Sequence, residues 1–167
     1  MTQEARSQVI INIPRSLAWE KLRDISLAHH YVPGIVNTRI VSPQKEGVGA
    51  SRYVYRRRNR YLQETVEEWH EGQGFALRLH KGDKPAAPFK QAHFRYQLAD
   101  HGPEQTLVQA SLRYCLPWGA VGRWLEKRML SVVQASVNDV VCCMKLYYES
   151  GKPIGKDELA AYRHAGE

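Results

Sequence analysis

The chain has 167 residues, of which 43% are hydrophobic and 25% are charged, and its 24 basic and 17 acidic residues give a formal charge of +7. This composition is ordinary for a soluble globular protein, and the length suits one domain with one sizeable core. The positive charge permits an anionic partner but does not require one.

Several broad classes of protein are disfavoured by what the sequence lacks. It has no run of about 18 apolar residues, the length that a transmembrane helix needs, and residues 1–6 lack the apolar segment of a signal peptide. The cysteines, Cys115, Cys142 and Cys143, are odd in number and two are adjacent, which argues against a disulfide framework or a zinc site. We therefore expect a cytoplasmic protein without a metal ion or another cofactor.

The chain begins with a predicted strand and two short helices. Residues 9–13 are β-branched and alternate weakly, which is typical of a strand. Ser16 is a plausible N-cap for a helix over residues 17–25, which carries apolar residues on one face. Residues 27–31 are predicted to form one further turn.

Six more strands are predicted in the middle of the chain, separated by turns rich in proline, glycine and charge: residues 35–42, 50–56, 60–70, 75–80, 91–98 and 106–114. Residues 81–90 are predicted to form a loop. Consecutive strands joined by short turns pair antiparallel, so these segments predict one curved antiparallel sheet of about seven strands.

The turn at residues 57–59 predicts the register of one hairpin. A three-residue turn there pairs opposite charges, two apolar residues and two aromatic rings: Arg52 with Glu64, Val54 with Leu62, and Tyr55 with Tyr61. If Arg52 and Glu64 face the interior, they form a desolvated ion pair, whereas an exposed pair contributes little to stability. The sequence leaves both arrangements open.

The longest periodic segment covers roughly residues 120–150 and predicts an amphipathic helix about 45 Å long. Its apolar residues recur at steps of three and four and fall on one side: Leu125, Met129, Val132, Val133, Val137, Val140, Val141, Met144, Tyr147 and Tyr148. A helix of this length needs a broad apolar surface, which the sheet supplies. We therefore predict an α+β domain over residues 1–152 and a polar C-terminal tail over residues 153–167, with a short helix from Asp157.

This order of elements resembles the START-like, helix-grip superfamily (SRPBCC), which includes birch-pollen-allergen-type proteins, lipid-transfer START domains and polyketide cyclases/dehydrases. Three segments carry the resemblance: WEKLRDISLAHHYVPG at residues 19–34, GVGASR at residues 47–52 and ETVEEW at residues 64–69. The resemblance implies two short helices after the first strand and a cavity between the long helix and the curved sheet. It also implies a small apolar or amphipathic ligand, and the coenzyme-Q-binding subgroup is one candidate relative.

The candidate ligand-binding residues lie on the predicted inner faces of the sheet and the helix. The sheet contributes Arg52, Glu64, Phe75, Leu77, Phe94, Tyr96 and Leu112. The helix contributes Met129, Val133, Val137, Val140 and Met144, and the flexible methionines suit ligands of varied shape. The alternative interpretation is that the apolar stripe of the helix only packs on the sheet as core.

These features predict binding or transport of a lipid, a quinone or a polyketide-like aromatic compound, with no catalysis or only weak catalysis. The sequence has no GxSxG, HExxH, P-loop or dinucleotide-binding motif. The alternative is a small polyketide aromatase/cyclase or dehydratase that acts in the same cavity by orientation and proton transfer. Glu64 and His70 are the candidate catalytic residues for that alternative.

The predicted hairpin tip is strongly basic and carries Arg56, Arg57, Arg58 and Arg60. Basic residues interleaved with aromatic residues suit nucleic acid or an anionic membrane. No RNA-binding aromatic motif or helix-turn-helix supports a nucleic-acid partner. We interpret the tip as a solvated turn that discourages edge pairing, with weak anionic-membrane contact as the alternative. The oligomeric state does not follow from the sequence.

Overall fold

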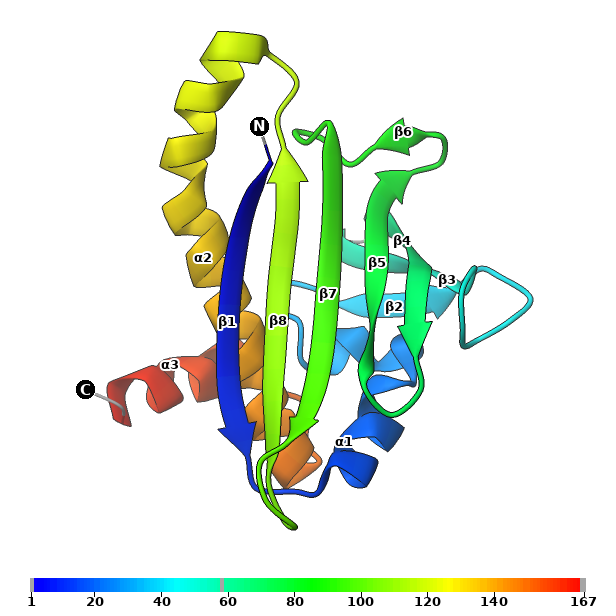
Figure 1. The fold of residues 1–167 in the computed structure, drawn as a ribbon, viewed down its shortest axis with the longest axis vertical. Coiled ribbons are helices and arrows are strands. Elements are labelled where there is room, and N and C mark those ends of the chain that lie inside the picture. Colours follow the sequence, from blue (N-terminus) through cyan, green and yellow to red (C-terminus); the bar gives the residue numbers. More distant parts are fainter. Residues whose placement is uncertain (1, 58, 166–167) are drawn as a thin grey trace.

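The structure is a computed structural model that describes residues 2–57 and 59–165, and it contains an antiparallel sheet crossed by one long helix (Figure 1). The strands are β1 (Gln3–Ile11), β2 (Asn37–Ile40), β3 (Ser51–Arg57), β4 (Arg60–His70), β5 (Gly74–Lys81), β6 (Lys84–Pro85), β7 (Gln91–Asp100) and β8 (Thr106–Cys115). The helices are α1 (Arg15–Leu22), the 3-10 helix η1 (Ile25–His30), α2 (Gly119–Ser150) and α3 (Lys156–Ala165).

The sheet runs β1-β8-β7-β5-β4-β3-β2, so that the first strand lies beside the last, and β6 pairs with β5. Each described pairing is antiparallel, as predicted. The prediction of a loop over residues 81–90 is wrong at Lys81, which ends β5, and at Lys84 and Pro85, which form β6. A strand of two residues has no periodicity that a sequence pattern could detect.

The predicted register of the β3–β4 hairpin is confirmed: Arg52 pairs with Glu64, Val54 with Leu62, and Tyr55 with Tyr61. A register shift between Tyr55 and Arg57 marks a bulge close to the turn, and bulges strengthen the local twist. Since alternate residues of a strand share a face, Arg52 and Val54 turn to the same side of the sheet.

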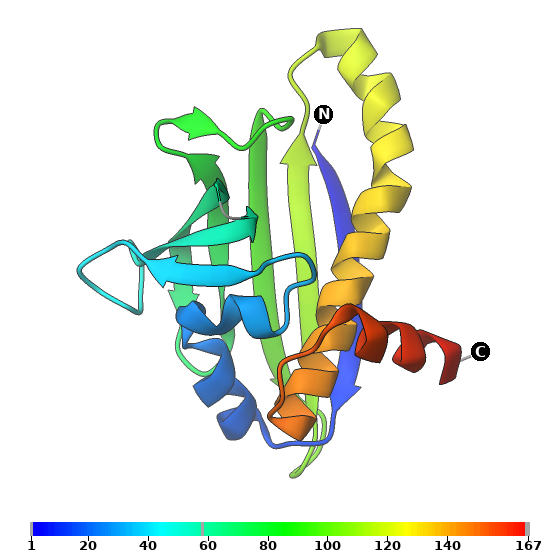
Figure 2. The same cartoon turned by 180° about the vertical axis from the view of Figure 1, so that it is seen from behind.

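The predicted long helix is observed as α2, which lies along β1 and β8 and crosses the inner side of the sheet (Figure 2). Val137, Val141 and Met144 on its inward face are at most 2% exposed. The prediction that Val132 also packs inward is wrong, because its side chain is 68% exposed. Periodicity places Val132 at the border of the apolar stripe, and at this level α2 borders an opening instead of packing on the strands.

By length and composition alone, α2 is the one helix in the described part of the chain that could cross a membrane. The core helix of a soluble protein passes the same test, so a single such helix is weak evidence for a membrane span. The sequence-based expectation that the chain has no transmembrane helix stays a prediction.

The first helix begins differently from the prediction. Ser16 is not its N-cap; Pro14 takes that position, and its carbonyl oxygen accepts a hydrogen bond from the Ala18 N–H at 3.1 Å. The helix also ends earlier than predicted, because Asp24 starts η1 with its side chain accepting from the Ser26 N–H at 3.0 Å. A side-chain cap of this kind competes with continuation of the preceding helix.

The C-terminal segment packs back on the domain, and the short helix expected from Asp157 is observed as α3. Leu159 of α3 is 7% exposed and joins the hydrophobic core, while Arg163 forms an ion pair with Asp139 of α2. Before α3, the Ile154 N–H donates to the His30 carbonyl oxygen at 3.0 Å. These contacts hold the segment against α2 and η1.

Candidate ligand-binding cavity

A cavity of about 460 Å³ lies between α2, the inner face of the sheet and the segment that joins β6 to β7. This volume falls within the range of small-molecule sites, roughly 300–1,000 Å³. Most of its walls are apolar, and the chain segments that supply them are η1 with the residues after it, strands β3, β4, β5, β7 and β8, and the middle of α2.

Eight of the twelve predicted ligand-binding residues line the cavity: Arg52, Glu64, Phe94, Tyr96, Leu112, Val133, Val137 and Val140. The other four lie outside its lining: Phe75, Leu77, Met129 and Met144. The lining residues of α2 fall within residues 132–140. Beyond them the helix packs on other core side chains, so that Met144 is fully buried as core.

Sequence reasoning missed part of the lining. Val54 and Leu62 line the cavity beside the ion pair. Each lies two residues from Arg52 or Glu64 along its strand and therefore shares a face with that residue, so strand alternation could have predicted both. Residues 86–89 also line the cavity. No pattern pointed to them, because they lie in an irregular segment that tertiary packing alone brings to the cavity.

The interior of the cavity carries a buried ion pair between Arg52 and Glu64. Arg52 Nε and Nη2 lie 2.7 and 2.6 Å from Glu64 Oε2, and the two side chains are 1% and 13% exposed. Arg52 Nη1 donates to the Ile25 carbonyl oxygen at 2.6 Å. Of the two arrangements that the sequence left open, the inward one is therefore observed, and it connects the β3–β4 hairpin to η1.

Electrostatics keep Arg52 charged. Burial opposes the positive charge and is the largest single influence, but the attraction and hydrogen bond of the Glu64 carboxylate, together with the interactions with Tyr31 and Tyr96, outweigh it. The pKa of the guanidinium therefore lies above its usual value. The cavity wall therefore presents a fixed cation in a region where water screens it little. A cation in such surroundings interacts strongly with a carbonyl, phenolate or carboxylate oxygen.

Three buried tyrosines, Tyr31, Tyr96 and Tyr148, gather near the ion pair. The Tyr31 ring contacts those of Tyr96 and Tyr148 edge to face, with centroids 6.5 and 5.7 Å apart. Burial raises the pKa of all three phenols, so they stay protonated at neutral pH. The hydroxyls of Tyr31 and Tyr148 have no hydrogen-bond partner among the described residues. The cluster therefore has spare hydrogen-bonding capacity beside the cavity.

The outer part of the cavity is basic. Arg56 and Arg60 line it and are exposed, and Tyr61 lies next to them. Arg57 is also exposed, while Arg58 lies outside the described residues. Part of the predicted arginine tip thus borders the cavity instead of standing apart from it.

The two candidate catalytic residues are separated in space. Glu64 lies in the cavity wall, but His70 lies outside the lining, at the end of β4, with its side chain 60% exposed and 3.8 Å from Glu68. A register shift between Val66 and Glu68 interrupts the alternation along β4. His70 therefore does not share the inward face that Glu64 occupies.

The described residues contain no group of three or more histidine, cysteine, aspartate or glutamate side chains that could hold a metal ion. The three cysteines are free thiols. The polar side chains that line the cavity are Arg52, Arg56, Arg60, Glu64, Tyr61, Tyr96 and Ser136.

No family model matches the sequence, and no curated protein matches it significantly. Solved structures do match. A START superfamily protein from Mycobacterium smegmatis is 13% identical, with a TM-score of 0.66 over 89% of this chain and 99% of its own. The Zhui aromatase/cyclase from Streptomyces sp. R1128 is 13% identical, with a TM-score of 0.63 over 92% of this chain and 100% of its own. Ara h 8.0201 is 11% identical, with a TM-score of 0.56 over 89% of this chain and 98% of its own.

Identities this low establish the fold and not the activity. The matches extend over nearly the whole of each chain, so they concern the domain as a whole. The chain therefore has the START-like, helix-grip α+β fold that its sequence predicted.

Proposed function

We propose that the protein binds or transports a small hydrophobic ligand in the cavity between α2 and the sheet. The observation that carries the proposal is one buried ion pair, Arg52 with Glu64, in a lining that is otherwise mostly apolar. A few placed polar groups in an apolar pocket are typical of small-molecule sites. The ligand is proposed to be a lipid, a quinone or a polyketide-like aromatic compound in a cytoplasmic setting, to which the free thiols are suited.

The polar and apolar parts of the lining suggest how such a ligand lies. Its polar group would accept hydrogen bonds near Arg52 and Tyr96, while its apolar body would run along Val133 and Val137 of α2. Burial of that body supplies the free energy of binding, at about 25 cal/mol per Å² of apolar surface. The polar contacts would select among ligands of similar shape.

Two neighbouring positions on α2 provide a matched test. Ser136 and Ala135 are both exposed, and Ser136 lines the cavity whereas Ala135 does not. Ser136→Trp should obstruct the cavity and weaken binding of a polycyclic fluorescent probe by about tenfold or more. Ala135→Trp should bind the probe like the parent. Equal probe affinity in all three proteins would refute the proposed site.

Native mass spectrometry of freshly purified protein, followed by extraction of whatever is bound, would identify the ligand class. A bound lipid, quinone or aromatic compound that is lost in Ser136→Trp supports the proposal. A co-purified molecule retained equally in Ser136→Trp and Ala135→Trp would place its site elsewhere.

A second candidate function is cyclisation or dehydration of a polyketide-like substrate in the same cavity. It is favoured by Glu64, a carboxylate held beside a fixed cation and near protonated phenols, because such a group can exchange a proton with a bound carbonyl compound. Glu64→Gln keeps the shape and a hydrogen-bond acceptor for Arg52 but loses the charge, so it should be less stable than the parent. Under conditions where circular dichroism shows the variant to be folded, it should retain probe binding and lose turnover. Carriage alone predicts that neither the parent nor Glu64→Gln converts the compound.

A further inference from the structure

An exposed apolar stripe runs along the first half of α2 and the residue before it. Four of its side chains are large, hydrophobic and mostly exposed: Trp118 at 55%, Val121 at 67%, Trp124 at 59% and Val132 at 68%. Steps of three, three and eight residues keep them on one side of a helix. We call this set the α2 stripe. Exposed apolar surface gathered in this way marks an interaction site more often than scattered side chains do.

Basic groups accompany the α2 stripe. The Arg128 guanidinium lies 5.0 Å from the centre of the Trp124 ring, and Lys127 beside it is exposed. The one acidic residue between positions 116 and 130 is Glu126, which is 2% exposed and accepts a hydrogen bond from the Leu116 N–H. The exposed charged side chains that the structure describes in this segment, Lys127 and Arg128, are therefore both basic.

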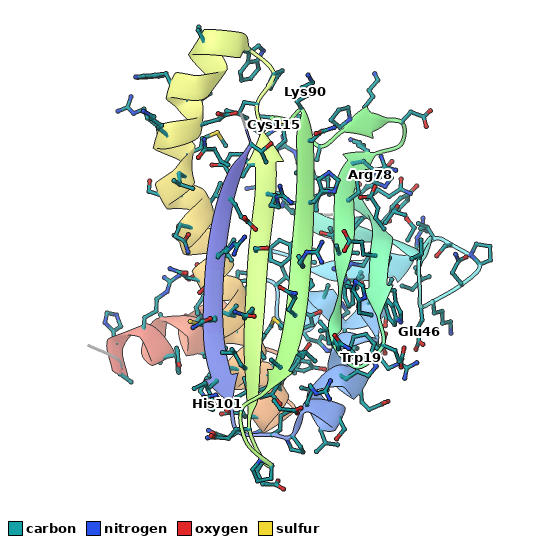
Figure 3. All side chains as sticks on the ribbon, in the orientation of Figure 1. Trp19, Glu46, Arg78, Lys90, His101 and Cys115 are labelled. Atoms are coloured by element: carbon teal, nitrogen blue, oxygen red, sulfur yellow. The ribbon has the colours of Figure 1, made fainter. Side chains whose placement is uncertain are left out.

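A second segment adds to this charge. Lys90, just before β7, is exposed, and its N–H donates to the Cys115 carbonyl oxygen at 2.8 Å. Figure 3 labels both residues at the end of the sheet from which the chain passes into α2. Lys90 therefore lies close to the start of the α2 stripe.

We propose that the α2 stripe docks the protein on an anionic lipid bilayer. Tryptophan favours the boundary between water and lipid, and a helix with an apolar face and basic neighbours suits the surface of an anionic membrane. A second copy of this chain fits less well, because two stripes facing each other would bring like charges together. Docking on a membrane does not depend on the proposed function. The kind of ligand that would be exchanged with the membrane rests on the proposed function.

The stripe is continuous with the cavity. Val132 belongs to the stripe and also lines the cavity, and Ser136, one turn further along α2, is exposed and lines it too. Docking through Trp118 and Trp124 would bring this side of the cavity close to the lipid. A hydrophobic ligand could then pass between bilayer and cavity with less exposure to water.

The test compares vesicles of phosphatidylcholine containing phosphatidylglycerol with vesicles of phosphatidylcholine alone, by co-sedimentation. The parent should bind the anionic vesicles about tenfold or more tightly than the neutral ones. Trp118→Ser/Trp124→Ser should lose most of this binding. Lys127→Gln/Arg128→Gln should weaken binding to anionic vesicles by about tenfold or more, since basic residues near an anionic surface contribute to the attraction.

Two control variants change exposed residues outside the stripe. Leu17 on α1 is 53% exposed and Arg57 is exposed in the β3–β4 hairpin, so Leu17→Ser and Arg57→Gln should bind anionic vesicles like the parent. Undiminished binding by Trp118→Ser/Trp124→Ser would overturn the proposal. Loss of binding in Arg57→Gln, with the tryptophan variant intact, would assign docking to the arginine hairpin instead. Self-association that depends on the two tryptophans, without vesicle binding, would assign the stripe to a second copy and also overturn it.

Failure of the proposed function gives a different result. Trp118→Ser/Trp124→Ser should still bind the soluble probe in the absence of vesicles, because neither tryptophan is part of the cavity lining. A parent protein that binds vesicles but no probe would refute the ligand cavity and leave the docking surface standing. A parent that binds the probe but no anionic vesicles would refute the docking surface alone.

Discussion

Arg52 and Glu64 lie opposite each other on β3 and β4, and two guanidinium nitrogens of Arg52 lie 2.7 and 2.6 Å from the same carboxylate oxygen. The Arg52 side chain is almost completely buried and the Glu64 side chain is mostly buried. The attraction between the two charges therefore offsets the free-energy cost of removing each of them from water. The pair therefore contributes to the fold as well as to the polarity of the cavity, and its two roles can be separated by substitution.

Replacing Glu64 with leucine should leave an unpaired buried cation and destabilise the protein by about 3–5 kcal/mol. Urea unfolding monitored by circular dichroism would measure the change. Arg52→Met/Glu64→Leu, which removes both charges, should recover most of the lost stability. If the double variant were no more stable than Glu64→Leu, the unpaired charge of Arg52 would not be the cause of the lost stability.

Gly74 is expected to be indispensable to the geometry of the cavity wall. Its φ is +142°, and a Cβ there would meet the Tyr96 carbonyl oxygen at 2.1 Å. Gly74→Ala should therefore force β5 and β7 apart, cost more than about 2 kcal/mol and weaken probe binding at Tyr96. Thermal melting and probe titration would measure the two effects.

Gly82 is the matched control, because its φ is +60° but an added Cβ would meet nothing within 4 Å. Gly82→Ala should cost only about 1 kcal/mol and leave probe affinity unchanged. If both substitutions had the same effect, the close approach to Tyr96 would not be the cause.

The fold could be predicted because its main elements have strong local patterns. The charge and aromatic pairs of the β3–β4 hairpin determined one register, and the three- and four-residue steps of α2 determined its length. β6 could not be predicted because a strand of two residues is too short to show an alternating pattern. The predicted N-cap of α1 was wrong because Pro14 and Ser16 are both residue types that occur at the start of a helix. The sequence alone does not show which of the two residues takes the N-cap position.

The cavity could be predicted only where alternation continues without a break. The register of the β3–β4 hairpin paired Arg52 with Glu64, but the sequence left open which side of the sheet the pair faces, and the structure places it inward. The irregularity between Val66 and Glu68 separated His70 from the face of Glu64. The periodicity of α2 identified Val132 as apolar without showing that no strand covers it. Residues 86–89 reach the cavity through tertiary packing, which no local pattern encodes.

Two valines on α2 should differ strongly in how much stability the protein loses when each is replaced by aspartate. Val141 is 2% exposed in the core, so Val141→Asp would bury an unpaired charge and cost several kcal/mol, enough to reduce the yield of folded protein. Val121 is 67% exposed, so Val121→Asp should change stability by no more than about 0.5 kcal/mol. Chemical denaturation of both variants tests the assignment of the two helix faces, and similar losses would contradict it.

Alkaline pH should unfold the protein through groups that are buried in their protonated forms. Burial raises the pKa of Cys143 to about 12 and that of Tyr96 and Tyr148 well above 10.0. The unfolded chain releases the same protons near 9.0 for a cysteine and 10.0 for a tyrosine. Since the unfolded chain loses protons at lower pH than the folded chain, stability that is complete below about pH 9 should fall as the pH rises toward about 12.

Melting temperature measured across this range would report the fall, and phenolate absorbance after a rapid pH jump would show its cause. The buried phenols of Tyr31, Tyr96 and Tyr148 should ionise only as the protein unfolds. Tyr148→Phe removes one buried hydroxyl without a hydrogen-bond partner, so it should retain its stability at neutral pH and lose less at alkaline pH. Immediate ionisation of all 9 tyrosines, with the fold intact, would contradict the buried cluster.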